Sequence, residues 1–146
     1  MLNDVAAKMM SDCPADVVFV LDQSKGVKQA GFDLMKSFLT QLLARMEIDN
    51  GHTRVGLVTY AGDIGEHFNL NAHSSLTSVQ SAISSLTYSG GSTDTAKALR
   101  YVRTTMLTSA AGDRCHVRNV VVVLTDGVSN DKEATKVGLP YAQCGS

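Results

Sequence analysis

Two stretches decide the fold: residues 16–24 read DVVFVLDQS, and residues 119–127 read NVVVVLTDG. Each begins with a run of apolar residues rich in valine, the pattern of a strand that is buried on both faces of a sheet. Each run stops at a polar motif, DQS at residues 22–24 and TDG at residues 125–127. We therefore expect two central strands, the most buried of the sheet, with polar side chains at their carboxyl ends.

The segments between these two strands alternate between helical and extended patterns. Apolar residues recur at three- and four-residue steps from Val27 to Met46, which predicts an amphipathic helix. Later helices are predicted through residues 76–86, with Ser74 or Ser75 as the cap, and through residues 98–106. Two further strands are predicted at residues 54–60 (RVGLVTY) and, shorter and at an edge of the sheet, at residues 66–70 (EHFNL).

Strands that alternate with helices predict parallel pairing through right-handed crossovers. The expected fold class is therefore α/β, a three-layer sandwich in which a mostly parallel sheet is flanked by helices on both faces. In such sheets ligands bind outside the carboxyl ends of the strands. The motifs at residues 22–24 and 125–127 lie at that edge.

Composition narrows the functional classes. With 146 residues the chain is long enough for one domain, and 44% hydrophobic against 18% charged residues is a globular composition rather than a disordered one. The net charge of -1 offers no basic cluster for nucleic acid or an anionic membrane. No apolar run approaches the roughly 20 residues of a membrane span, and residues 1–11 lack the pattern of a secretory signal.

Aspartates at two strand ends on the same edge of the sheet predict a cation site. Asp22 and Asp126 would be costly to bury and would repel each other, and a bound divalent cation removes both problems. Ser24 and Thr93 add neutral hydroxyl oxygens, so the ligand types favour Mg²⁺ or Mn²⁺ over zinc. The alternative is a metal-free arrangement in which the aspartates cap helix N-termini and hydrogen-bond the two hydroxyls.

In order along the chain, the motifs DVVFVLDQS, RVGLVTYAG, FNLN, SLTYSGGSTDTAKAL and NVVVVLTDGVSND resemble the von Willebrand factor A-type domain. The resemblance runs from Cys13 to about Lys136. It implies a metal-ion-dependent adhesion site (MIDAS) made by an Asp-x-Ser-x-Ser loop, a threonine and a second aspartate. Asp22 and Ser24 match the loop, Thr93 matches the threonine by its spacing after two glycines, with Thr95 as a neighbouring candidate, and Asp126 matches the second aspartate.

The chain departs from the family pattern at two places. Gly26 stands where the last serine of the loop is expected, so four of the five metal positions remain. The sequence also stops in the helix that follows the Asp126 strand, before the family's last strands and final helix. We therefore expect a short tail at residues 1–13 and an A-type domain, incomplete at its carboxyl end, at residues 14–146.

The cysteines leave the redox compartment open. Cys13 and Cys144 lie near the two ends, a placement that suits a disulfide joining the ends of an extracellular module, as in extracellular relatives. Three reduced thiols, with Cys115 as the third, would suit a cytosolic protein. Cys13 and the Asp-Arg-x-x-x-x-Asn stretch at residues 113–119 resemble A-type domains of matrix proteins more than intracellular ones.

The resemblance implies a secreted, extracellular, non-enzymatic adhesion module. Its partner would be a protein, such as collagen or another matrix protein, whose acidic side chain completes the coordination of the cation. Two alternatives are an intracellular A-type scaffold in a multiprotein assembly and a metal-free interaction module. Catalysis has little support: residues 91–97 lack the second glycine of a phosphate-binding loop, and no histidine stands at a motif spacing from Ser24.

Overall fold

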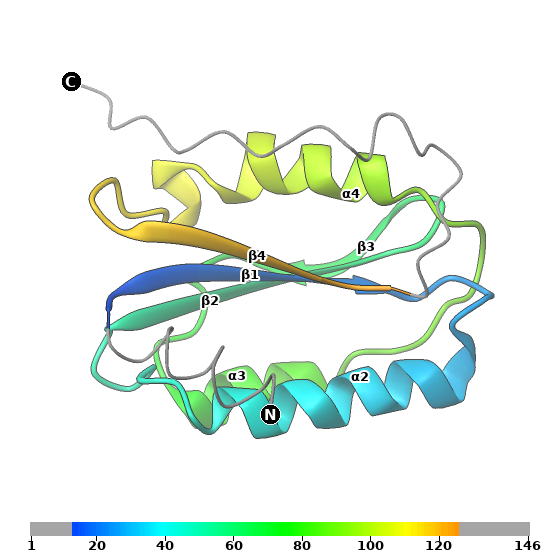
Figure 1. Cartoon of the computed structure of the whole chain (residues 1–146), viewed down its shortest axis with the longest axis horizontal. Helices are drawn as coiled ribbons and strands as arrows, with labels where there is room; N and C mark the ends of the chain where they lie inside the picture. Colours follow the sequence, from blue (N-terminus) through cyan, green and yellow to red (C-terminus); the bar gives the residue numbers. More distant parts are fainter. Residues whose placement is uncertain (1–12, 126–146) are drawn as a thin grey trace.

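A computed structural model describes residues 13–125, in which one sheet lies between two layers of helices (Figure 1). The strands are β1 (Ala15–Asp22), β2 (Thr53–Tyr60), β3 (Ile64–Phe68) and β4 (Arg118–Leu124). The α-helices are α2 (Lys28–Leu43), α3 (Leu76–Ser84) and α4 (Thr95–Tyr101), and α4 continues into a π-helical turn, η1 (Val102–Met106), before a 3-10 turn, η2 (Ser109–Ala111). No helix within residues 13–125 is long and apolar enough to cross a membrane.

The sheet has the strand order β3-β2-β1-β4, with β1 parallel to both of its neighbours. The expected α/β fold with a mostly parallel sheet is therefore confirmed. Strand β3 is the exception, since it runs antiparallel to β2 and lies at an edge. Only residues 61–63 connect β2 to β3, and a parallel crossover needs a dozen residues or more.

Helices α2 and α3 cover one face of the sheet and α4 covers the other (Figure 1). Successive residues of β1 serve the two cores in turn. Phe19 and Leu21 belong to the core under α2 and α3, whereas Val18 and Val20 belong to the core under α4. Every residue of β1 is buried, as the valine-rich pattern predicts for a central strand.

Strand β4 differs from its prediction. It is the outer strand of the described sheet, and its residues from Asn119 to Leu124 are half-buried rather than buried on both faces. Strand β2, which has a neighbour on each side, is more buried than β4. The expectation that the two valine-rich runs form the two most buried strands therefore holds for β1 and is wrong for β4.

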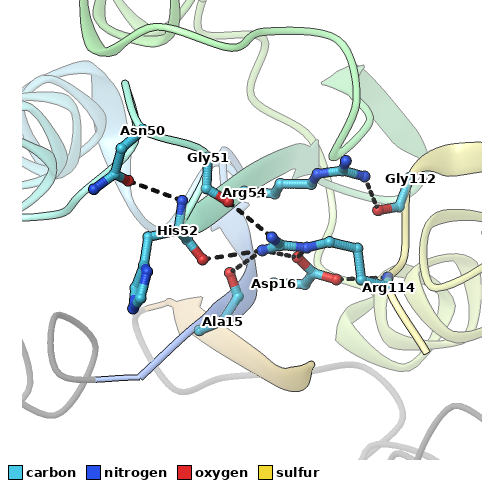
Figure 2. A network of polar contacts seen from close by, with 8 residues as sticks. All are labelled: Ala15, Asp16, Asn50, Gly51, His52, Arg54, Gly112 and Arg114. Atoms are coloured by element: carbon cyan, nitrogen blue, oxygen red, sulfur yellow. Dashed lines mark hydrogen bonds and ion pairs between the residues drawn. The ribbon is translucent and has the colours of Figure 1, made fainter. Parts of the chain in front are cut away.

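An ion pair holds the amino-terminal end of the sheet together (Figure 2). The carboxylate of Asp16 is fully buried and receives the Nε–H and backbone N–H of Arg114 at 2.9 and 2.7 Å. The same guanidinium donates to the carbonyl oxygens of Gly51, His52 and Ala15 at 2.8, 3.1 and 3.2 Å. Arg114 thus ties the start of β1 to the loop before β2, and the charge of Asp16 is compensated inside the protein.

The cysteines do not follow the pairing that the extracellular resemblance implied. Cys13 is an exposed free thiol, and Cys115 is disulfide-bonded. A bridge between Cys13 and Cys144 is therefore not what the structure shows, and Cys144 itself lies outside the described residues. Sequence position near a chain end is a weak guide here, because a disulfide needs Cα atoms within about 7 Å.

Candidate metal centre

The loop that follows β1 holds the first two predicted ligands. Asp22 is fully buried at the last position of the strand. Its carboxylate accepts the backbone N–H of Ser24 at 2.8 Å and the hydroxyl of Thr125 at 2.7 Å. These two bonds orient the carboxylate and leave further lone pairs on its oxygens.

Ser24 is the other predicted ligand of this loop, and it is also fully buried. Its Oγ atom is shielded from solvent and has no hydrogen-bond partner among the described residues. Its backbone carbonyl, in contrast, accepts the hydroxyl of Tyr88 at 3.1 Å. A buried hydroxyl without a partner carries a desolvation cost, so this atom is where an oxygen-seeking ligand would be most favourable.

The glycine-bearing loop before α4 lies directly against the loop after β1. The backbone N–H of Lys25 donates to the carbonyl of Gly91 at 2.8 Å, and that of Gly90 donates to the carbonyl of Gln23 at 3.0 Å. Gly90 and Gly91 have φ values of +75° and +114°, which glycine adopts without strain. The two loops are therefore fixed to each other, and Thr93 is carried to the same edge of the sheet.

Two threonines of this segment are candidate ligands, and their surroundings differ. Thr95 is buried and its hydroxyl is 2.9 Å from the hydroxyl of Tyr60. Thr93 is half-buried, and its hydroxyl bonds to none of the described residues. The assignment of Thr93 rather than Thr95 as the ligand, made from the spacing, stays a prediction.

Two positions of the predicted set are not supplied by the described residues. Gly26 has no side-chain oxygen, and Asp126 lies outside residues 13–125. Within the described part of the chain, no three His, Cys, Asp or Glu side chains gather as a metal-binding group. The arrangement that is present consists of one carboxylate and hydroxyls, which is a set for a hard cation rather than for zinc.

Two residues contribute to this site without having been assigned a role from the sequence. Thr125 orients the carboxylate of Asp22, and Tyr88 holds the carbonyl of Ser24. Thr125 stands directly before Asp126 in the strand-end motif, so its position was a usable signal. Nothing local pointed to Tyr88, which is 64 residues from its acceptor.

A family model for the von Willebrand factor type A domain matches residues 16–143. The chain belongs to this family. A collagen alpha-1(XX) chain from Homo sapiens is 39% identical over 118 residues, which is 81% of this chain and 9% of the relative. Matrilin-1 from Mus musculus is 36% identical over 121 residues, 81% of this chain and 24% of the relative. The chain thus spans a quarter or less of the length of these relatives.

Solved structures agree with the assignment of the fold. The proximal thread matrix protein 1 of the mussel byssus, with a zinc-occupied MIDAS motif, superposes with a TM-score of 0.75 at 22% identity. The match covers 90% of this chain and 34% of that one. At this identity the likeness shows a common fold.

Proposed function

We propose that this chain is a non-enzymatic binding module of an extracellular matrix protein, which holds an acidic side chain of its partner through a divalent cation. The observation that carries the proposal is the buried pair at the end of β1. The carboxylate of Asp22 and the partnerless Oγ of Ser24 are both removed from solvent. A cation at this point would satisfy the hydroxyl and neutralise the carboxylate together.

The residues present fit Mg²⁺ or Mn²⁺. Asp22, Ser24 and Thr93 would supply oxygens from two loops that are bonded to each other, and Asp126 would supply the second carboxylate. Water would replace the hydroxyl that Gly26 lacks. The mussel relative with a zinc-occupied MIDAS motif supports a divalent cation at this edge of the fold. A bound cation would act as a Lewis acid, and a carboxylate of the partner would complete its coordination.

Several observations favour an extracellular matrix location. The relatives include collagen and matrilin chains at 36–39% identity. The disulfide at Cys115 favours an oxidising compartment, where disulfides persist. The Asp-Arg-x-x-x-x-Asn stretch, which resembles matrix relatives, forms part of the described structure, where Arg114 closes the end of the sheet.

A metal-free interaction module is the second candidate, and one observation favours it. The carboxylate of Asp22 already receives two hydrogen bonds, and Gly26 removes one ligand. In this case the site would be a fixed pair of loops, and the binding surface would not depend on a cation.

Calorimetric titration with Mg²⁺ and Mn²⁺, together with thermal unfolding, separates the two candidates. A cation at about 100 times its dissociation constant adds roughly 2.7 kcal/mol of stability, which corresponds to a rise of several degrees in Tm. The proposal expects this response from the wild type, a stronger one from Gly26→Ser, and none from Ser24→Ala combined with Asp126→Ala. If neither the wild type nor Gly26→Ser responds while both are folded, the module is metal-free.

A further inference from the structure

Two lysines flank the candidate metal centre without a partner. Lys25 directly follows Ser24, and its backbone N–H is bonded to Gly91, so this residue lies where the two site loops meet. Lys28 begins α2. Both are exposed, and neither side chain makes an ion pair or hydrogen bond to residues 13–125. Two positive charges are therefore free next to a site that is expected to bind a carboxylate.

Three acidic side chains near this rim make contacts within residues 13–125. Asp63 pairs with Lys97 at 2.9 Å, and Asp94 accepts the backbone N–H of Lys97 at 2.9 Å as the cap of α4. Asp33, the first acidic residue of α2, accepts a hydrogen bond from Gln29 at 3.0 Å. Asp63 is therefore compensated by a counter-charge, whereas Asp33 and Asp94 keep their negative charge and are held by neutral donors.

The first turn of α2 also presents positive potential, and its conformation costs folding free energy. No side chain caps its first turn and no acidic residue lies in it, although a helix N-terminus favours negative charge. The first residue of the helix is instead a lysine, Lys28, whose φ is +65°. Residues other than Gly, Asn and Asp rarely adopt this conformation. Such departures from local rules concentrate at functional sites, where the surroundings enforce them.

We infer that Lys25, Lys28 and the uncapped N-terminus of α2 form a second anchor for a protein partner that carries several acidic side chains close together. The inference rests on the proposed function: one carboxylate would complete the cation, and a neighbouring carboxylate would bind the lysines. The cation that binds the first of these carboxylates would lie at the Oγ atom of Ser24, which is buried and has no hydrogen-bond partner among the described residues. The partner would thus be recognised by a run of Asp or Glu rather than by one acidic residue.

A protein segment fits this surface better than a sulfated polysaccharide. A polyanion of high charge density needs a broad basic patch, whereas in the described part of this rim two free lysines lie beside several aspartates. Ion pairs of exposed lysines are individually weak and screened by salt. Their expected contribution is therefore to selectivity and to the association rate, with the cation as the main anchor.

The test uses the full chain and two probe peptides of equal length, one with six consecutive glutamates and one with a single glutamate among Gly and Ser. Affinity is measured with Mg²⁺ and with EDTA, at about 20 mM and about 500 mM salt, where screening is strong. The double variant Lys25→Gln/Lys28→Gln is compared with Arg100→Gln/Arg103→Gln, a control that removes two exposed charges from the segment of α4 and η1. Mg²⁺ affinity of each chain without peptide is measured separately.

We expect the lysine variant to bind the six-glutamate peptide about three- to tenfold more weakly at low salt. Its binding of the single-glutamate peptide and the behaviour of the arginine control should change little. Its Mg²⁺ affinity should stay equal or rise, because two positive charges near a cation are removed. Weaker peptide binding together with a Mg²⁺ affinity that does not fall separates a second anchor from general damage to the site.

Three results would overturn the inference. Mg²⁺-dependent binding of both peptides without an effect of the lysines would leave the proposed function standing and remove the second anchor. No Mg²⁺-dependent binding to either peptide would remove both. Tighter, Mg²⁺-independent binding of heparin, lost in the lysine variant, would assign the surface to a sulfated polysaccharide instead.

Discussion

Replacing Arg114 by alanine tests the ion pair that closes the amino-terminal end of the sheet. The guanidinium makes two contacts with the fully buried Asp16 carboxylate, at 2.9 and 2.8 Å, and three with backbone carbonyls. In Arg114→Ala the carboxylate would keep the backbone N–H of residue 114 and lose its counter-charge. Breaking a buried pair from one side costs about 3–5 kcal/mol, because an uncompensated charge stays behind.

Urea unfolding at neutral pH measures this cost, and thermal unfolding should show a fall in Tm of roughly 10 °C for a chain of this size. The matched control is Arg103→Ala, since Arg103 is exposed and its side chain makes no hydrogen bond or ion pair within the described residues. Arg114→Lys should retain part of the stability, because a lysine keeps the charge without the planar fork that serves four acceptors. A loss below about 1 kcal/mol in Arg114→Ala, similar to the control, would refute the reasoning.

Three further substitutions test other features of the fold. Lys28→Gly should stabilise the chain by about 0.5–1 kcal/mol in urea unfolding, because glycine adopts the positive φ of residue 28 without strain and this relief exceeds its entropy cost. A loss of stability would show that the backbone of Lys28 is not strained. Gly112→Ala should cost more than Gly51→Ala in the same assay, since both have positive φ but only Gly112 would place a Cβ 2.7 Å from Asn71; equal losses would contradict this. Burial raises the pKa of Asp113 above its ordinary value of 3.8, so the ionised carboxylate costs stability at neutral pH. Asp113→Asn should therefore stabilise the chain at neutral pH, and this gain should vanish as the pH falls below 3.8. A gain that persists in acid would contradict the reasoning.

Features that depend on local pattern were predictable from the sequence. The valine run before Asp22 identified the central strand, and the polar motif after it identified the edge at which the candidate site lies. The spacing around the glycines at residues 90 and 91 predicts Thr93 rather than Thr95 as a ligand, and that choice stays a prediction.

Features that depend on distant pairs were not predictable. Asp16 and Arg114 are 98 positions apart, and nothing in either neighbourhood shows that they meet. The half-burial of β4 follows from its place at the edge of the described sheet, which its valine-rich sequence does not reveal. The same limit explains the cysteines, because closeness to the chain ends carries no information about distance in space.

Paramagnetic line broadening by Mn²⁺ tests the central claim most directly, because it locates the ion in the folded chain. The account predicts that substoichiometric Mn²⁺ broadens the backbone amide signals of Ser24, Gly91 and Thr93 first. The signals of Gly51 and Arg114, at the opposite end of β1, should stay sharp (Figure 2). Mg²⁺ in excess should restore the broadened signals. Broadening that begins elsewhere, or that is uniform along the chain, would contradict a cation site at the carboxyl end of β1.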